Sequence, residues 1–291
     1  MLKGIDTSHF SGFSPAQLQT MVKTNRLYFN FIKASEAATI QDARFVELWN
    51  MSRQAGLATG AYHFFRPLSD VAAQAQNFIT QYKKVSRMGV LPPVVDLEWS
   101  PVAGVEQWNQ VLPAQRIPKI KMFLSAIEEA CNVKPIIYTA PAFWQEFITS
   151  QSTPADNSFF VEYPLWVVDL KNSGKLPAPW VNTTPAFKQT HFGEKATTTD
   201  PYDVLDQDLY TGDLKGFLNA TMPGFTIMNG FPASFIVADL QAQLIAKGVL
   251  QGAADGQFGN HTEQAVKDFQ TANGLFANGI IDAQTWNKLL A

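Results

Sequence analysis

Two acidic residues stand two positions apart at the end of an apolar run, in Pro93-Val94-Val95-Asp96-Leu97-Glu98-Trp99. If this run is a β-strand, alternation places both carboxylates on one face, about 6 to 7 Å apart along the strand. When two carboxyls lie close together, the charge of one raises the pKa of the other. Near neutral pH one of them is then protonated and the other ionised. The pair can therefore act as a general acid with an anionic neighbour. The alternative is that both acids pair with Lys or Arg or cap the next helix.

Other predicted strands also carry acids. Asp6 ends the first strand, and Asp206 and Asp208 lie in the last one. The first and last strands of a closed barrel are neighbours, so Asp6 and Asp206 would converge on the mouth that holds Asp96 and Glu98. Asp6 by itself could equally form an Asx turn. Four acids without a metal-binding pair of histidines suggest a glycosidase, and we predict these catalytic residues: Glu98, Asp96, Asp6 and Asp206.

Aromatic residues at other strand ends could line a sugar groove, because ring faces stack on pyranose rings. We predict that the substrate is bound by Tyr62, Phe64, Tyr138, Trp166 and Gln189. The alternative is that the aromatic side chains belong to the core.

The sequence gives little support for a metal site or for a Ser or Cys nucleophile. The four histidines form no H-E-x-x-H motif, no G-x-S-x-G motif is present, and the single Cys131 falls on the apolar side of a predicted helix. We expect no metal and no cofactor.

The positioning elements alternate between strands and helices. Strands are predicted at 2–6, 27–33, 57–65, 90–97, 135–139, 164–170, 186–192 and 202–210. Helix starts are marked by Ser14-Pro15, by Asp42 before 43–55, and by Ser69 before 70–85. The pattern predicts an α/β fold with a parallel sheet, namely a modified β/α barrel of eight strands and fewer than eight helices.

A small helical unit is expected to follow the barrel. Gly and Pro interrupt residues 221–233, which predicts a linker between a barrel domain at 1–220 and a three-helix domain at 234–291. Within the second domain, a tight turn at Asp255-Gly256 leading to Thr262 is repeated at Asn278-Gly279 leading to Thr285.

Length and composition limit the function classes. The chain has 291 residues, 46% of them hydrophobic, and a net charge of -3 without a basic run. These values favour a folded protein and disfavour nucleic acid as a partner. No apolar segment is long enough to span a membrane, and the start lacks the apolar core of a signal peptide. We expect a monomer that is synthesised in the cytoplasm without a signal peptide and does not insert into membranes.

Six ordered motifs resemble those of the family 25 glycoside hydrolases, the Chalaropsis-type lysozymes. They are Gly4-Ile5-Asp6-Thr7-Ser8, Phe31-Ile32-Lys33-Ala34-Ser35-Glu36, Gly60-Ala61-Tyr62-His63-Phe64, Val94-Val95-Asp96-Leu97-Glu98, Ile136-Ile137-Tyr138-Thr139 and Leu165-Trp166-Val167. The resemblance implies hydrolysis of the β-1,4 bond between N-acetylmuramic acid and N-acetylglucosamine in peptidoglycan. It also implies net retention of configuration, with Glu98 as the general acid and the three aspartates in support. Two departures stand out: the usual Gln after the first motif is replaced within 8–12, and Asp208 stands where Asn is usual.

The tail resembles the common peptidoglycan-binding domain. The matching residues include Leu240-Gln241, Asp255-Gly256-Gln257-Phe258-Gly259, Phe269-Gln270 and Thr285-Trp286. A catalytic domain joined to a wall-binding module is typical of an endolysin, which would act at the bacterial cell wall after release; a bacterial effector or autolysin would look the same.

Two alternatives remain. A non-catalytic peptidoglycan-binding protein has no use for two unneutralised acids at a barrel mouth. A chitinase-like N-acetylglucosaminidase would use the D-x-x-D-x-D-x-E pattern at 203–210, but Tyr210 replaces its acid.

Overall fold

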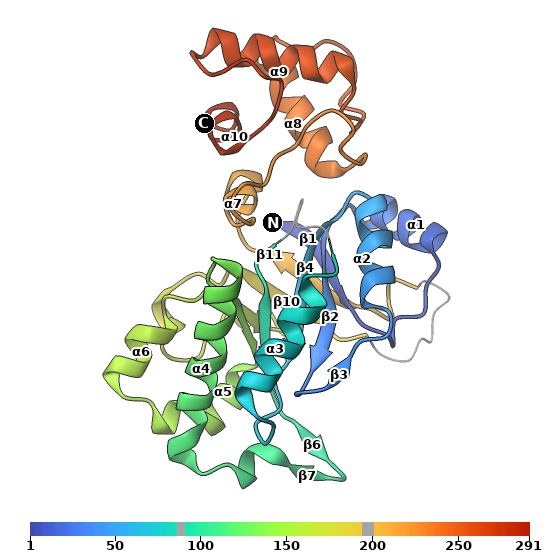
Figure 1. Ribbon diagram of the computed structural model, residues 1–291. Coiled ribbons are helices and arrows are strands. Elements are labelled where there is room, and N and C mark those ends of the chain that lie inside the picture. Colours follow the sequence, from blue (N-terminus) through green and yellow to red (C-terminus); the bar gives the residue numbers. More distant parts are fainter. Residues whose placement is uncertain (86–90, 194–200) are drawn as a thin grey trace.

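The computed structural model describes residues 1–85, 91–193 and 201–291. It consists of a β-barrel with helices around it and a small helical unit at one end (Figure 1). The barrel strands are β1 (Leu2–Thr7), β2 (Leu27–Glu36), β4 (Ala58–Phe64), β5 (Val94–Leu97), β8 (Ile136–Thr139), β9 (Leu165–Val168), β10 (Phe187–His191) and β11 (Asp206–Tyr210). They pair in the order β1-β11-β10-β9-β8-β5-β4-β2, and β2 pairs with β1 to close the ring. The expected eight-stranded barrel is confirmed. Residue 90, the predicted start of the fourth strand, lies outside the described residues.

The sheet is mixed, so the expectation of a parallel sheet is wrong for one of the eight barrel strands. β11 runs antiparallel to both β1 and β10. A parallel neighbour needs a crossover that is usually helical, and the described residues between β10 and β11 contain no helix. Asp206 therefore begins its strand, yet it lies opposite Asp6 in the β1–β11 register. The antiparallel direction brings the start of β11 to the carboxyl ends of the parallel strands.

Helices surround the barrel. They are α1 (Pro15–Asn25), α2 (Phe45–Gln54), α3 (Val71–Tyr82), α4 (Pro113–Cys131), α5 (Pro141–Phe147), α6 (Pro154–Phe160) and α7 (Leu214–Asn219). One of them, α7, packs at the amino-terminal end of the barrel, where Phe217 contacts the interior ring of Phe29. Ser14 caps α1 as expected, whereas Asp70, one residue after the predicted Ser69, caps α3. Cys131 is buried on α4, as predicted. In the described ranges no helix combines the length and the apolar character that crossing a membrane requires.

Within the described residues, three short strands and three 3₁₀ turns lie in the loops that connect the main elements of the barrel domain. β3 (Ile40–Gln41) pairs with the end of β2, and β6 (Pro101–Val102) forms a hairpin with β7 (Val105–Glu106). Single 3₁₀ turns occupy Gln107–Gln110, Thr149–Gln151 and Trp180–Asn182.

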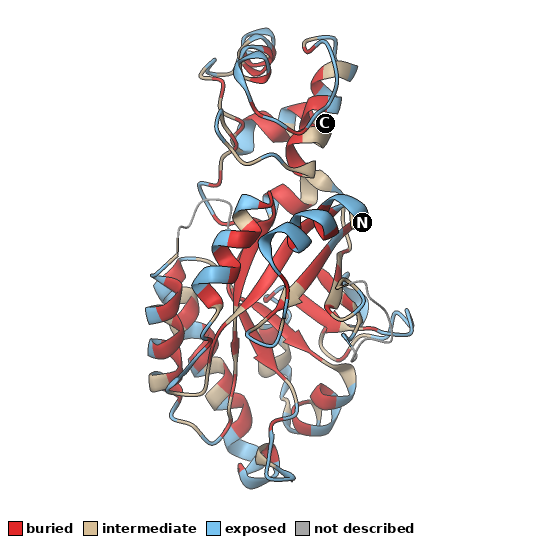
Figure 2. Cartoon of the chain, turned by 90° about the vertical axis from the view of Figure 1, so that its right-hand side faces the viewer, coloured by how far each residue is buried: buried red, intermediate tan, exposed pale blue. Residues whose placement is uncertain are grey.

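Aromatic rings fill the barrel interior. Phe29, Phe31 and Phe187 contact one another with ring centroids 5.0 to 5.7 Å apart. A Cβ on Gly4 would lie 2.3 Å from the Phe29 ring, and one on Gly60 would lie 2.4 Å from the Phe31 ring, so only glycine leaves room for these side chains. The red interior in Figure 2 reflects this packing. Because the interior is filled, ligands reach the barrel only at its ends.

The second unit has three helices, α8 (Phe235–Ala246), α9 (Asn260–Ala272) and α10 (Ala283–Leu289). The predicted repeat has a structural basis in two buried glutamines. The Gln241 amide accepts from Gly256 N and donates to Thr262 Oγ1, and the Gln270 amide accepts from Gly279 N and donates to Thr285 Oγ1. Each turn is thus fixed by one amide from the preceding helix.

The second unit packs on the amino-terminal end of the barrel strands. Asp239 of α8 forms an ion pair with Arg26 and accepts a hydrogen bond of 2.6 Å from Tyr28, at the start of β2. Trp286 of α10 donates to Asn219 of α7 at 2.8 Å. Figure 1 shows this unit at the opposite end of the barrel from β3 and the β6–β7 hairpin. Within residues 221–233, Ile227 is fully buried and pairs with Ile281.

Candidate active site

A small cavity of about 70 Å³ opens at the carboxyl ends of the barrel strands. Its lining residues are Asp6, Tyr62, Asp96, Glu98, Tyr138, Trp166, Gln189 and Asp206. Seven of these residues lie in seven different strands, and the eighth, Glu98, follows β5 by one residue. The structure thus brings together every predicted site residue other than Phe64.

Gln189 connects three of these side chains. Its Nε2 donates to Asp6 Oδ2 at 2.8 Å and to Asp206 Oδ2 at 3.3 Å, while its Oε1 accepts from the Tyr138 hydroxyl at 2.6 Å. The other oxygen of Asp206 accepts from Gly193 N at 2.6 Å. These bonds fix the orientation of both aspartates at the junction between β1, β10 and β11.

Asp208 lies in β11, two residues after Asp206, and the sequence analysis assigned it no role. It is 1% exposed, and its Oδ1 accepts from Trp166 Nε1 at 2.9 Å. Burial, and then the charge of Asp6, raise the pKa of Asp208 well above its usual range. The charges of Asp6 and Asp208 therefore oppose each other inside the buried barrel, which disfavours ionisation of both carboxyls at once. The two-residue spacing from Asp206, like that of Asp96 and Glu98, could have indicated this position.

Asp96 and Glu98 form the second pair of acids. Asp96 is 6% exposed, and its Oδ1 has no hydrogen-bond partner in the part of the chain that is described. Burial, and then repulsion from Glu98, raise the pKa of Asp96 well above its usual range. Burial, and then the charge of Asp206, raise the pKa of Glu98 to about 7. A carboxyl with this pKa can carry a proton near neutral pH and release it to a leaving group.

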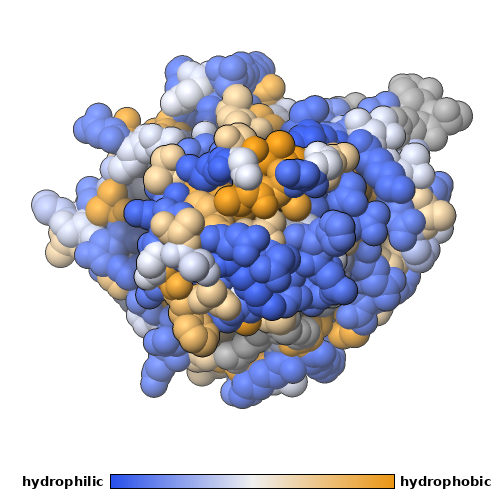
Figure 3. Space-filling model, turned by 90° about the horizontal axis from the view of Figure 1, so that it is seen from above, coloured by the Kyte–Doolittle hydropathy of each residue, from blue (hydrophilic) through white to orange (hydrophobic). Residues whose placement is uncertain are grey.

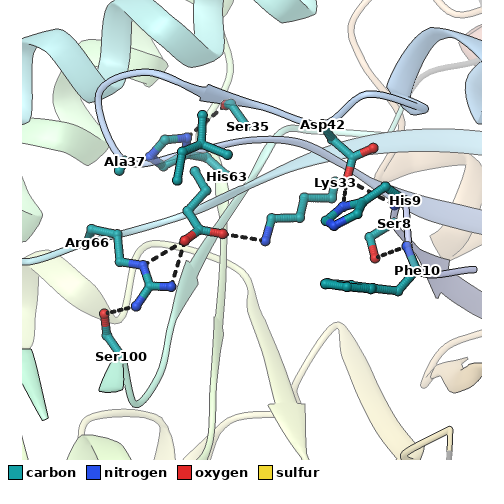
Figure 4. Close-up of polar contacts among 12 residues, drawn as sticks. Ser8, His9, Phe10, Lys33, Ser35, Ala37, Asp42, His63, Arg66 and Ser100 are labelled. Atoms are coloured by element: carbon teal, nitrogen blue, oxygen red, sulfur yellow. Dashed lines mark hydrogen bonds and ion pairs between the residues drawn. The ribbon is translucent and has the colours of Figure 1, made fainter. Parts of the chain in front are cut away.

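Two cations flank the acids and were missed by the sequence reasoning, although Lys33 lies within a quoted motif. Lys33 Nζ lies 2.7 Å from Glu36 Oε2, and Arg66 Nε donates to Glu36 Oε1 at 2.8 Å (Figure 4). Arg66 also donates to Ser100 Oγ at 2.9 Å. Burial alone would raise the pKa of Glu36, but the two cations outweigh it and lower that pKa. Both cations also oppose the rise in the pKa of Glu98.

Phe64 was predicted to bind substrate, but it is not among the residues that line the cavity. Its ring centre lies 5.0 Å from Lys33 Nζ and 4.7 Å from Arg66 Cζ. The attraction between these cations and the ring faces holds Phe64 beside the Lys33–Glu36–Arg66 group. A contact between Phe64 and substrate stays a prediction.

The aromatic lining residues are mostly covered. Tyr138 is 6% and Trp166 is 2% exposed, and the Trp166 ring stacks on Phe31 with centroids 4.6 Å apart. Their polar atoms bond to Gln189 and Asp208. These two rings therefore form the floor of the cavity and position its polar groups.

The arrangement suits proton transfer and charge stabilisation. Several acids of raised pKa surround a small cavity, so a protonated carboxyl and an ionised one can face the same bond. Among residues 1–85, 91–193 and 201–291, no group of three or more His, Cys, Asp or Glu is arranged to hold a metal ion.

A larger cavity of about 450 Å³ lies between α1 and the second unit, and its lining includes Lys23, Arg26 and Asp255. It has no cluster of buried carboxyls, so its size does not make it the better candidate for catalysis.

Comparison with family models assigns both parts of the chain. Residues 5–194 match Glycosyl hydrolases family 25, and residues 236–289 match Putative peptidoglycan binding domain. The first match includes seven of the eight cavity residues, all except Asp206.

Individual proteins agree with these matches. Lysozyme M1 of Streptomyces globisporus is 30% identical over 168 residues, which cover 57% of this chain and 54% of that protein. The autolytic lysozyme of Clostridium acetobutylicum is 23% identical over 279 residues, which cover 94% of this chain and 74% of that protein. The structure of the bacterial lysozyme from Streptomyces coelicolor superposes with a TM-score of 0.61 at 26% identity, covering 73% of this chain and 93% of that one. The chain spans about half the length of several curated relatives that it matches.

Proposed function

The chain belongs to Glycosyl hydrolases family 25, and on that premise we propose that it hydrolyses the β-1,4 bond between N-acetylmuramic acid and N-acetylglucosamine in bacterial peptidoglycan. The observation that carries the proposal is the set of buried carboxyls at the barrel mouth, with Glu98 at a pKa of about 7. A carboxyl of this pKa is still partly protonated near neutral pH and can donate that proton to a leaving oxygen. The similarity to proteins named as lysozymes supports the choice of substrate.

In the proposed mechanism Glu98 protonates the leaving oxygen and then, as its conjugate base, activates water. One of Asp6, Asp96 or Asp206 stabilises the positive charge that develops on the sugar ring. The substrate's own 2-acetamido group can act as the internal nucleophile, which gives net retention of configuration. Gln189 acts through Asp6 and Asp206, whose orientation it fixes by hydrogen bonds. The charge of Asp6 raises the pKa of its neighbour Asp208. Tyr62, Tyr138 and Trp166 bound the space in which the sugar must fit.

We propose that residues 1–220 form the catalytic domain and that residues 234–291 bind peptidoglycan, with 221–233 between them. The match to a peptidoglycan-binding family supports this division. Seen from the side of the second unit, the surface is mostly hydrophilic with a small apolar patch (Figure 3), as a polar polymer would require. The protein would act at the bacterial cell wall, where a tail bound to an insoluble polymer raises the local concentration of the catalytic domain.

The decisive experiment compares the wild type with Glu98→Gln on purified peptidoglycan. Loss of the general acid should lower the rate by about 10²- to 10⁴-fold, while binding to the wall persists. Mass spectrometry of the released fragments then identifies the bond that is cut. Reducing-end muramic acid identifies a muramidase, and reducing-end glucosamine a glucosaminidase. Near-normal hydrolysis by Glu98→Gln would refute the assignment of the acid, and binding without any turbidity loss by the wild type would indicate a non-catalytic binder.

A further inference from the structure

The catalytic cavity is too small to account for binding of a polymer. Its volume is about 70 Å³, whereas pockets for small ligands measure roughly 300 to 1,000 Å³. A glycan strand must therefore obtain most of its contacts from surfaces around the mouth.

One such surface follows β1 directly. Phe10 lies four residues after Asp6 and is 83% exposed. Its ring centroid is 3.9 Å from that of His9, with an angle of 38° between the planes. Phe10 therefore presents a largely uncovered apolar ring on the loop that follows the carboxyl end of β1, the end of the barrel at which the cavity opens.

The loop that carries Phe10 is fixed by its own hydrogen bonds. Asp42 Oδ2 accepts from His9 N at 3.0 Å and lies 2.7 Å from His9 Nδ1, and the Asp42 side chain is fully buried. Ser8 Oγ accepts from Phe10 N at 3.3 Å, and Ser11 N donates to Ser8 O at 2.8 Å. Figure 4 shows His9 directed at Asp42, with the Phe10 ring beyond it. A ring held on such a loop loses little conformational freedom when it binds a ligand.

A second exposed aromatic ring follows another strand of the barrel. Trp99 follows Glu98, is 37% exposed, and donates from Nε1 to Glu146 Oε2 at 3.2 Å. Phe10 follows β1 and Trp99 follows β5, and two strands, β2 and β4, separate these positions around the barrel rim. A strand that crosses the mouth can contact both.

We propose that the Phe10 ring, backed by His9, is a stacking platform for a sugar ring of the glycan strand just outside the catalytic cavity. This inference rests on the proposed hydrolysis of peptidoglycan. The C–H face of a pyranose is apolar and matches the negative face of an aromatic ring, and the loop needs no rearrangement to offer that face. The ligand is the glycan itself, so the stem peptides are not required.

The test uses soluble, uncrosslinked strands of alternating N-acetylglucosamine and N-acetylmuramic acid without peptides. Phe10→Ala should raise KM about 3- to 10-fold, because part of an apolar contact is lost, with kcat unchanged within about twofold. Phe10→Tyr keeps the ring and should retain the wild-type KM. Met122→Ala is the matched control, since Met122 is an apolar residue 49% exposed on α4.

Binding to the Glu98→Gln variant, measured by calorimetry with the same strands, should weaken by the same factor when Phe10→Ala is added. This measurement separates the inference from the proposed function, because it does not depend on turnover. An unchanged KM and Kd for Phe10→Ala would overturn the platform, and so would an equal loss in Phe10→Tyr.

Discussion

Replacing Glu98 by Gln should stabilise the folded protein at alkaline pH as well as remove hydrolysis. Burial, and then the charge of Asp206, raise the pKa of Glu98 from 4.5 to about 7. The unfolded chain releases this proton near pH 4.5, whereas the folded chain keeps it until about pH 7. The stability contributed by Glu98 is therefore fully present below pH 4.5 and is lost as the pH rises through 7. Gln cannot ionise, so the variant avoids this loss.

The pKa difference sets the size of the effect. A carboxyl with a pKa of about 7 in place of 4.5 lowers the free energy of unfolding by about 3 kcal/mol above pH 8 relative to pH 4. The free energy of unfolding of Glu98→Gln, relative to that of the wild type, should therefore rise by about this amount between pH 4 and pH 8. Urea unfolding at pH 4 and pH 8, followed by tryptophan fluorescence, measures it.

Glu129→Gln provides the control, because it makes the same chemical change at an exposed position on α4. Its difference from the wild type should be nearly the same at both pH values. If the difference for Glu98→Gln is also independent of pH, Glu98 is not held protonated by its surroundings and the argument for its role as general acid fails.

Three further predictions concern the tail and the reaction. A chain ending near Thr221 should still cleave soluble glycan strands but sediment poorly with whole peptidoglycan, and binding as tight as that of the full chain would assign the tail another role. Gln241→Leu should destabilise the second unit by about 2 to 4 kcal/mol in thermal unfolding, because it leaves Gly256 N and other buried groups unpaired; an unchanged melting temperature would contradict this. NMR of the first-formed product should detect the β-anomer, whereas an initial α-anomer would mean that water attacks in a single step.

The sequence by itself determined the elements and the chemistry of their ends. Apolar runs predicted all eight strands, and the acids, aromatic residues and Gln189 near their ends included every residue that lines the cavity. Local rules suffice here, because strand alternation and helix caps depend on residues only a few positions apart. The turns of the second unit were predictable for the same reason, since each Gly stands at a fixed offset from the Thr that follows it.

The tertiary structure alone decided which side chains interact. The direction of β11 does not follow from alternation, because a strand shows the same period of two in either direction. Gln189 reaches Asp6 across 183 positions only because β11 pairs with both β10 and β1 in the closed barrel. Phe64 shares a strand and a face with Tyr62, yet the cations from Lys33 and Arg66 hold its ring outside the cavity. The pKa of Glu98 depends on the same closure, because burial and the nearby charge of Asp206 exist only in the folded barrel.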